Sequence, residues 1–251
     1  MIVLKKGEPV LLFSKDEEYL VKISDKKINT KSGMINLGKI KKKKFGDKIK
    51  SHLGKTFVIV KPNLQDVLKK MQRFPQIITS KDVGMILVYT GVGPDSLIVD
   101  AGSGSGFLAI SLANYLNKGK IVTYEKDNKI FKVAKDNIKK SGLKNIILKN
   151  KDFVKSVNEK NVDLVTLDLH YPEKAINRAY HILKVGGQLF VYSPTIDELV
   201  NVLRKIKKIK GFSYVKVVEN IVREWQTERT IRPKTMGLMH TGFLIFVRKV
   251  E

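Results

Sequence analysis

The sequence predicts an α/β protein with a doubly wound, mostly parallel, seven-stranded Rossmann-like sheet, preceded by a small amino-terminal β domain. Three observations support this. From about residue 96 onward, strand-like and helix-like apolar patterns alternate, as in successive βαβ units. A buried strand ends at Asp100 and is followed by glycines at alternate positions and then by a helical pattern. The first 60 residues instead contain several short strand-like runs separated by turn residues.

The amino-terminal part reads as a small antiparallel sheet or barrel, which we assign to residues 1–62. Turn signals rich in Ser, Asp and Gly separate its expected strands, at residues 10–13, 19–24, 27–30, 34–37 and 56–60. Asn63 stands where a helix N-cap is expected, so residues 63–79 are interpreted as a helical linking segment. A helix over 80–89 then opens the second domain, which runs over residues 80–251.

The second domain carries the alternating pattern. Its expected strands are residues 97–100, 120–125, 146–149, 162–168, 188–192, 214–222 and 242–248. Residues 162–168 are almost continuously apolar, as a central parallel strand should be, and the last two strands are expected to form an antiparallel edge pair. Helical patterns over 172–183 and 195–209 follow, and Thr195 with Glu198 has the spacing of a capping box.

The charge balance points to a polyanionic partner. There are 48 Lys plus Arg against 24 Asp plus Glu, a net charge of +24, and nucleic acid is the leading candidate. A lysine-rich proteome that solvates every surface is the alternative, while no basic amphipathic segment suggests a membrane surface. Residues 1–55 hold 15 Lys, no Arg and 6 acids, and this excess favours phosphate contact. It peaks in a run of four: Lys41, Lys42, Lys43 and Lys44.

The absence of cysteine excludes disulfides, thiolate catalysis and cysteine zinc sites, and we expect no metal site. Residues 1–20 lack the pattern of a secretory signal, and no apolar run approaches the roughly 20 residues of a membrane span. The expected location is therefore the cytoplasm, without a membrane partner.

The glycine pattern discriminates between cofactors. A dinucleotide fingerprint would need a glycine at Phe107, and no Gly-Lys-Ser/Thr occurs, which excludes a P-loop. Asp-x-Gly-x-Gly-x-Gly instead resembles motif I of class I S-adenosylmethionine (SAM) methyltransferases. Backbone N–H groups and one acid suit the carboxylate and ammonium groups of SAM. The expected contacts here are Asp100, Gly102, Ser103, Gly104, Ser105, Gly106, Phe107 and Leu108.

Acidic residues follow the ends of four expected strands, where open α/β sheets bind ligands: Asp100, Glu125, Asp152 and Asp168. Glu125, with Lys126 beside it, can accept hydrogen bonds from ribose hydroxyls. Asp152 can accept one from an adenine amino group, and Phe153 either packs the ring or is simply core. Asp168 faces the expected acceptor, where a carboxylate would stabilise positive charge that develops on adenine attacked at N1.

Together these segments resemble the TrmI family of tRNA (adenine-N1) methyltransferases, and its archaeal members most. The resemblance is carried by residues 76–82, 100–106, 124–125, 163–169, 183–187, 192–194 and 240–244. It implies SAM as donor, a T-loop adenine of tRNA at position 58, with 57 as a second target, and a homotetramer. It also implies Asp168 as the catalytic carboxylate, motif I and Glu125 as SAM contacts, Asp152 as the adenine contact, and Gln76 near the methionine end of SAM.

The chain departs from this family at Thr79 and Ser80, where members commonly carry His or Tyr followed by Pro. An aromatic side chain there could hold the flipped base, and Tyr171 or His170 could replace it. Arg232 and His240 are further candidates for RNA contact, although a structural role for His240 is the simpler interpretation. We expect tRNA and not DNA as partner.

Two other functions remain open. A class I methyltransferase could act on a small molecule such as a corrinoid precursor, or on protein isoaspartate; the net charge of +24 argues against both. A non-catalytic RNA-binding protein could keep SAM as a structural ligand. The retained acids Asp100, Glu125 and Asp168 argue against that.

Overall fold

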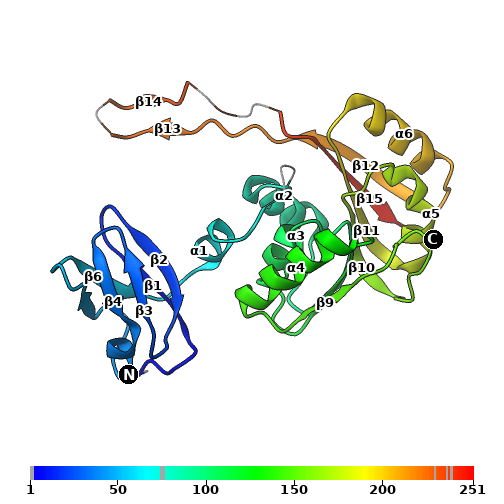
Figure 1. The fold of residues 1–251 in the computed structure, drawn as a ribbon. Helices are drawn as coiled ribbons and strands as arrows, with labels where there is room; N and C mark the ends of the chain where they lie inside the picture. Colours follow the sequence, from blue (N-terminus) through cyan, green and yellow to red (C-terminus); the bar gives the residue numbers. More distant parts are fainter. Residues whose placement is uncertain (1–2, 74–76, 229, 236, 238–239) are drawn as a thin grey trace. The chain divides into compact units, whose positions relative to one another are not determined.

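The computed structural model describes residues 3–73, 77–228, 230–235, 237 and 240–251. It divides into two compact units, Met1–Met71 and Gln72–Glu251. Figure 1 shows the course of the chain through both. Helix α1 (Leu64–Lys69), which the sequence placed in the linking segment, belongs to unit 1. Asn63 and Asp66 complete a capping box there, and the Lys69 ammonium lies 3.6 Å from the Glu18 carboxylate.

Unit 1 is built on a four-stranded antiparallel sheet in the order β2-β1-β6-β5. A separate hairpin of β3 and β4 and the 3₁₀ helix η1 complete it. Alternating apolar side chains point to one interior, where Val10, Leu12, Phe57 and Ile59 are fully buried. The bounds are β1 (Pro9–Phe13), β2 (Glu18–Lys22), β3 (Lys27–Thr30), β4 (Gly33–Asn36), η1 (Leu37–Ile40), β5 (Lys48–Lys50) and β6 (Thr56–Val60).

Strand β5 was not predicted from the sequence. It has three residues, of which only Ile49 is apolar and buried, so it carries almost no periodic signal. The other five strands of the sheet and hairpin begin and end within two residues of their expected places.

Unit 2 contains the predicted seven-stranded sheet, in the order β12-β15-β11-β10-β7-β8-β9. Five strands are parallel, and β15 runs antiparallel between β11 and β12, so the expected antiparallel edge pair is confirmed. The bounds are β7 (Leu97–Ala101), β8 (Lys120–Tyr124), β9 (Ile146–Lys149), β10 (Val162–Leu167), β11 (Leu183–Ser193), β12 (Phe212–Glu219) and β15 (Phe243–Lys249).

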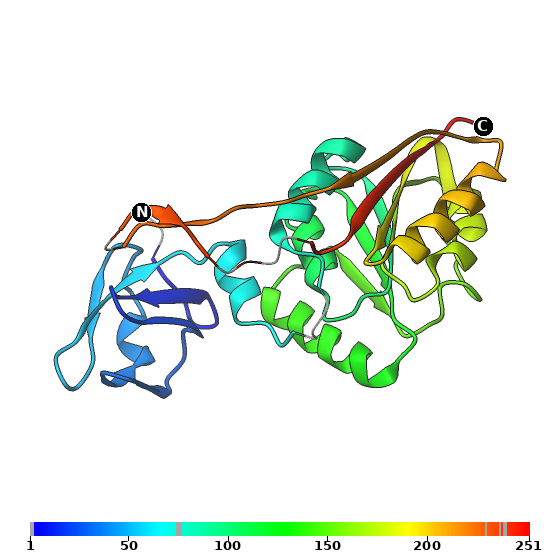
Figure 2. The same cartoon turned by 90° about the horizontal axis from the view of Figure 1, so that it is seen from above.

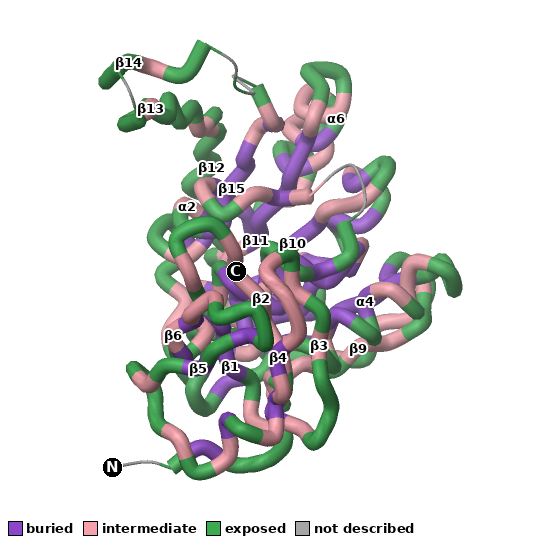
Figure 3. The backbone as a smooth tube through the Cα atoms, turned by 60° about the vertical axis from the view of Figure 1, so that its left-hand side comes forward, coloured by how far each residue is buried: buried purple, intermediate pink, exposed green. Residues whose placement is uncertain are grey.

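Helices cover both faces of this sheet (Figures 1 and 2). On one face α2 (Ser80–Thr90) and α3 (Phe107–Ala113) pack on it, and α4 (Asn128–Ser141) follows β8. On the other face α5 (Ile176–Ile182) and α6 (Ile196–Lys207) bury their apolar sides. Figure 3 shows the consequence: the central strands are buried and the outer sides of the helices are exposed. Because β7 to β11 pair in parallel, all five strands direct their carboxyl ends to the same edge of the sheet.

Two local expectations need correction. The helix predicted over 172–183 is split into η2 (Pro172–Lys174) and α5, and β11 begins five residues earlier than predicted, at Leu183. Tyr171 has a φ of 63°, in the left-handed region, and Pro172 begins η2, as a proline can at a first helical position. Ala175, with a φ of -90° and a ψ of -17°, then separates η2 from α5.

Strands β12 and β15 continue into an arm whose described residues are 220–228, 230–235, 237 and 240–242, and in it β13 (Trp225–Gln226) pairs with β14 (Arg232–Pro233). Within unit 2 the arm extends outward from the sheet (Figure 1). In the part of the chain that the structure describes, no helix has the length and apolar character needed to cross a membrane.

Candidate active site

The glycine loop between β7 and α3 is fixed by backbone contacts. The N–H groups of Gly102 and Ser103 both donate to the Tyr124 carbonyl, each at 3.0 Å. Gly102 has a φ of +92°, and a Cβ on it would lie 1.9 Å from the backbone carbonyl oxygen of Asp168. Only glycine fits there, so the loop and the end of β10 are in direct contact.

Asp100 lies beneath this loop and is 1% exposed. Its carboxylate accepts hydrogen bonds from the Thr123 and Thr166 hydroxyls of the two flanking strands, both at 2.6 Å. Burial raises the pKa of Asp100 to about 6, although these two hydroxyls act in the opposite direction. Sequence analysis missed both threonines, because their partnership with Asp100 requires strands β8 and β10 to flank β7.

Glu125 closes the loop from the end of β8. One carboxylate oxygen accepts from the Gly104 amide at 3.1 Å, and the other from the Asp127 amide at 3.0 Å. Glu125 is 8% exposed, yet it also lines a cavity at the carboxyl ends of the strands. Its charge therefore orders the loop and faces the same space.

This cavity has a volume of about 340 Å³. It brings together eight of the predicted site residues: Gly102, Glu125, Lys126, Asp152, Phe153, Asp168, His170 and Tyr171. The rest of motif I, from Ser103 to Leu108, and Asp100 do not line it. Its other lining residues were not predicted: Tyr124, Lys151, Val154, Leu169 and Lys174.

Asp168 follows β10, and its amide donates to the Ala101 carbonyl at 2.9 Å. The carboxylate remains accessible from the cavity but is surrounded by protein and by other acids. Burial is the largest cause that raises its pKa to about 7, followed by the charges of Asp100, Glu198 and Glu125. A carboxyl group so placed titrates near neutral pH, as acid–base and charge-stabilising groups in active sites often do.

The aromatic wall of the cavity is braced from behind. Tyr124 and Phe153 are 2% exposed and pack edge to face, with ring centroids 5.7 Å apart. The Tyr124 hydroxyl donates to Glu159, whose other carboxylate oxygen accepts from the Lys149 ammonium at 2.5 Å. This network fixes the Tyr124 ring, and sequence analysis missed it because its members are up to 35 residues apart in the chain.

His170 and Tyr171 form the exposed rim, with ring centroids 4.2 Å apart. The Tyr171 side chain is about half exposed, and the Lys174 ammonium lies 4.5 Å from its ring centroid. An accessible aromatic ring next to a cation is suited to stacking on a nucleobase.

Several predicted residues are not among those that line the cavity. His240 contacts Glu219 and the Pro194 carbonyl at the base of the arm, and the Glu219 carboxylate raises the pKa of its imidazole. Arg232 is in β14 on the arm, and the four lysines 41–44 follow η1 in unit 1, where Lys41 pairs with Asp25. Gln76 lies outside the described residues.

Asn137 of α4 joins the glycine loop to Gln72, the first residue of unit 2. It is fully buried, and its amide nitrogen donates to the Ser105 and Gln72 carbonyls, both at 2.8 Å. Its amide oxygen accepts from the Gln72 N–H at 3.2 Å. A polar residue on the apolar side of a helical pattern was the available signal, and the sequence analysis did not use it.

Three buried side-chain atoms have no hydrogen-bond partner among the described residues: Ser105 Oγ, Ser193 Oγ and Glu198 Oε2. All three belong to segments that follow or end strands at this edge of the sheet. Ser105 lies in the glycine loop, where its free hydroxyl and the fixed loop fit the polar groups of SAM. The described residues contain no cluster of His, Asp and Glu able to hold a metal ion.

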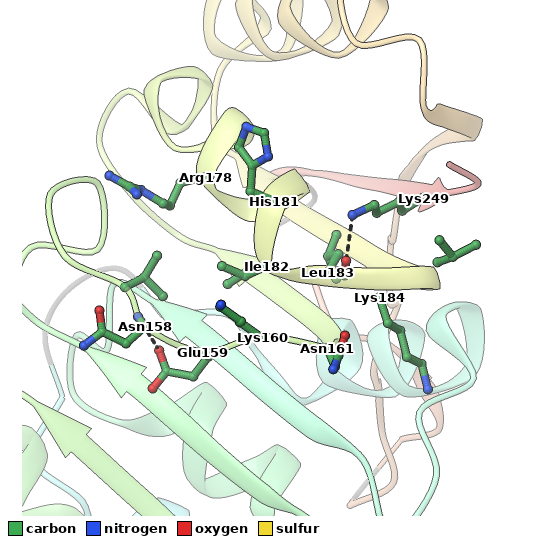
Figure 4. A pocket seen from close by; sticks show the side chains of 12 residues that line it. Asn158, Glu159, Lys160, Asn161, Arg178, His181, Ile182, Leu183, Lys184 and Lys249 are labelled. Atoms are coloured by element: carbon green, nitrogen blue, oxygen red, sulfur yellow. Dashed lines mark hydrogen bonds between the residues drawn. The ribbon is translucent and has the colours of Figure 1, made fainter.

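A second depression, of about 640 Å³, lies at the amino ends of β10 and β11 between residues 157–161 and α5 (Figure 4). Arg178, His181 and Lys160 line it, and Lys249 donates to the Leu183 carbonyl at 2.8 Å. It is larger but lies opposite the carboxyl ends of the strands, where sheets of this type bind ligands.

Sheet order, glycine loop and strand-end acids define a class I SAM-dependent methyltransferase fold, and solved structures agree. A Thermotoga maritima SAM-dependent O-methyltransferase is 33% identical with a TM-score of 0.87, covering 99% of this chain and 95% of its own. An Aquifex aeolicus tRNA (m1A58) methyltransferase TrmI is 25% identical, with a TM-score of 0.79 and full coverage of both chains. The predicted fold class is thus confirmed.

The family follows from sequence comparison. Residues 57–242 match the family model described as the tRNA methyltransferase complex GCD14 subunit. The Methanocaldococcus jannaschii tRNA (adenine(57)-N(1)/adenine(58)-N(1))-methyltransferase TrmI is 32% identical over 95% of this chain and 94% of its own. The chain therefore belongs to the GCD14/TrmI family of methyltransferases, as its motifs predicted.

Proposed function

We propose that this protein is a SAM-dependent tRNA (adenine-N1)-methyltransferase that forms 1-methyladenosine in the T-loop, at position 58 and also at 57. The observation that carries the proposal is Asp168, a carboxylate with a pKa near neutrality in a cavity shared with the glycine loop and Glu125. The M. jannaschii relative is named for adenines 57 and 58 and the A. aeolicus structure for adenine 58, and both the fold and the family support the same reaction.

The cofactor site is formed by the loop 102–108 together with Glu125 and Asp152. Backbone amides of the loop and the Ser105 hydroxyl would hold the polar end of SAM, and Glu125 would accept hydrogen bonds from ribose hydroxyls. Asp152 and the braced rings of Phe153 and Tyr124 would enclose the adenine. When bound, SAM supplies an electrophilic methyl group on a sulfonium.

Asp168 holds the acceptor adenine. In its ionised form the carboxylate accepts a hydrogen bond from the exocyclic amine and so orients N1 towards the methyl group. As N1 is alkylated, the ring and its amine become positively charged, and the nearby negative charge stabilises them. Positioning of the two reactants supplies the remaining catalysis.

The lysines of unit 1 and the arm are proposed to bind the tRNA backbone. Among residues 41–44, Lys41 pairs with Asp25, and the side chains of Lys42 and Lys44 are exposed to solvent. Such contacts are sequence-independent and can offset the few kcal/mol that flipping a base requires. Tyr171, with His170 beside it, is the proposed platform for the flipped base, and Arg232 is a further RNA contact.

We further propose a homotetramer working in the cytoplasm, where tRNA is modified. The M. jannaschii and A. aeolicus proteins above carry the TrmI name, and this chain covers nearly all of the first. Light scattering on purified protein measures the assembly directly.

An O-methyltransferase is the main rival, because the T. maritima structure carries that description. A precorrin methyltransferase from Geobacter metallireducens is only 19% identical, which shows the fold alone. The acidic cavity with Asp168 favours an acceptor that becomes cationic over one that loses a proton from oxygen.

The test is to incubate the protein with labelled SAM and unmodified tRNA, then to digest the RNA and identify the nucleoside. We expect 1-methyladenosine at 58 and 57. Label in another nucleoside, in a small molecule only, or in none of the substrates would reject the proposal. A transcript with both adenines replaced by guanosine is the control.

A further inference from the structure

Two of the three unpartnered buried atoms are not explained by the cofactor. Ser193 is the last residue of β11 and is fully buried, and Glu198 lies in the first turn of α6, five residues later. Within the described residues, neither Ser193 Oγ nor Glu198 Oε2 has a hydrogen-bond partner. Buried polar atoms are paired in the great majority of cases, so a pair of exceptions at one strand end points to a missing ligand.

Glu198 does not fulfil the role that its position in the helix predicts. The Thr195 hydroxyl accepts from the Glu198 amide at 3.3 Å, but only this half of the expected capping box is formed. Helix α1 shows the complete arrangement, in which the Asp66 carboxylate accepts from the Asn63 amide at 2.8 Å. The predicted capping box at α6 is therefore wrong in its second half, and the carboxylate is directed elsewhere.

The Glu198 carboxylate turns towards the segment after β10. Its Oε1 lies 3.9 Å from Nδ1 of His170, and its side chain is 20% exposed. Helix α6 also packs on η2, which follows Tyr171 directly. Glu198 thus lies beside His170, which lines the cavity that carries Asp168.

The two carboxylates also repel each other, since the Glu198 charge contributes to the raised pKa of Asp168. Holding two acids close together with one oxygen unpaired is unfavourable in the free protein. The arrangement becomes favourable when a ligand brings hydrogen-bond donors to both. A nucleoside offers such donors on its exocyclic amine and on its ribose hydroxyls.

We propose that Glu198 binds the acceptor nucleoside by accepting a hydrogen bond from its amine or its ribose 2′-hydroxyl, with the Ser193 hydroxyl in the same subsite. This rests on the proposed function, because it concerns the acceptor of that same reaction. Glu198 would be a second carboxylate of the acceptor site, beside Asp168, and would contribute to the choice of nucleoside.

The primary experiment compares Glu198→Gln with Asp197→Asn. Asp197 is exposed in the same helical turn, so its variant removes the same charge from the amino end of α6 without touching the site. We expect Glu198→Gln to lower kcat/KM for tRNA about 10-fold with an unchanged Kd for SAM, and Asp197→Asn to stay within about 2-fold. Equal effects of both variants would reject the proposal.

Modified tRNA distinguishes the two donors. The same variants are assayed on tRNA with 2′-deoxyadenosine, or with purine riboside lacking the amine, at the target position. The penalty of Glu198→Gln should disappear on the substrate that lacks the donor. A penalty of the same size on all three substrates would overturn the inference.

Ser193→Ala provides a second variant that removes only one hydroxyl, and thermal melting checks that each protein is folded. We expect a loss of about 3-fold in kcat/KM for tRNA. A wild-type protein inactive on adenosine-containing tRNA would reject the proposed function itself. An active wild type with unaffected Glu198→Gln and Ser193→Ala would reject only this inference.

Discussion

Gly102 packs against the backbone carbonyl of Asp168, so the glycine loop is in direct contact with the residue that carries the proposed catalytic carboxylate. A Cβ at Gly102 would lie 1.9 Å from that oxygen and 2.9 Å from the carbonyl carbon. Both partners are backbone atoms that end neighbouring parallel strands, and neither can move without shifting its strand. Loop position and acid position are thereby coupled.

Gly102→Ala should therefore damage both functions of the site. The added Cβ clashes with the Asp168 carbonyl, and a φ of +92° is strained for alanine. We expect a loss of about 2 kcal/mol or more in unfolding free energy and a large increase in the Kd for SAM, measured by denaturation and calorimetry. Gly84→Ala is the control, because a Cβ in α2 meets no atom within 4 Å. Similar effects of the two substitutions would contradict the coupling.

Asp168→Asn should separate chemistry from cofactor binding. The amide keeps the shape of the side chain but cannot stabilise a cation, so kcat should fall about 10²–10³-fold. The Kd for SAM should change little, since Glu125 and the loop remain. Single-turnover kinetics with saturating tRNA measure the first quantity and calorimetry the second. Near-normal turnover would exclude the role assigned to Asp168.

The pH profile should report ionisation of the same group. Because the pKa of Asp168 is raised to about 7 and the ionised form is required, kcat/KM should rise with pH up to about 7 and then level. Asp100 and Glu125 face it from β7 and β8, and Glu198 from α6, so the apparent value belongs to the group of acids. The residual kcat/KM of Asp168→Asn should not show this rise with pH. If the variant shows the same rise as wild type, another residue is responsible for the titration.

The free energy of unfolding of the ligand-free protein should depend on pH in the opposite sense to kcat/KM, because ionisation of Asp168 lowers it. The folded state keeps the Asp168 proton up to about pH 7, whereas the unfolded chain releases it near 3.8. Its contribution to stability is thus complete below pH 3.8 and is lost as pH rises towards 7. At pH 8, Asp168→Asn should be more stable than wild type by about 1 kcal/mol, a value reduced because the group is partly open to water. Urea unfolding at pH 8 and pH 5 measures whether this gain shrinks in acid.

Asn137→Leu should make the glycine loop less rigid, because leucine fills a similar volume but provides no hydrogen-bond donor. The substitution leaves the carbonyls of Ser105 and Gln72 without their donor, so the Kd for SAM should rise about 10-fold. Asn145→Leu is a matched control, because Asn145 also donates to two backbone carbonyls, those of Ala113 and Leu116, away from the loop. If the rise in the Kd for SAM, divided by the loss of unfolding free energy, is the same for both variants, Asn137 has only a structural role.

The local pattern of apolar, glycine and acidic residues in the sequence was sufficient to predict the fold and part of the candidate site. Period-two and period-3.6 apolar spacing located almost every strand and helix, because burial imposes these periods on the sequence. Asp100 and the glycines predicted a cofactor-binding loop between β7 and α3, and the acids after successive parallel strands predicted a shared edge. Glu125, Asp152 and Asp168 do line one cavity there.

Other features depended on the tertiary structure, because they join residues that are distant in the chain. Thr123 and Thr166 meet Asp100 only once three strands pair, and Asn137 meets Gln72 across 65 residues. Glu198 had the spacing of a capping box, but packing of α6 against η2 turned its carboxylate towards His170. The sequence by itself determined which acids stand at the strand ends, and its net charge of +24 predicted a polyanionic partner. Tertiary packing decided which acids share a cavity and how their mutual charge raises the pKa of Asp168, because burial and repulsion depend on distances that no local pattern contains.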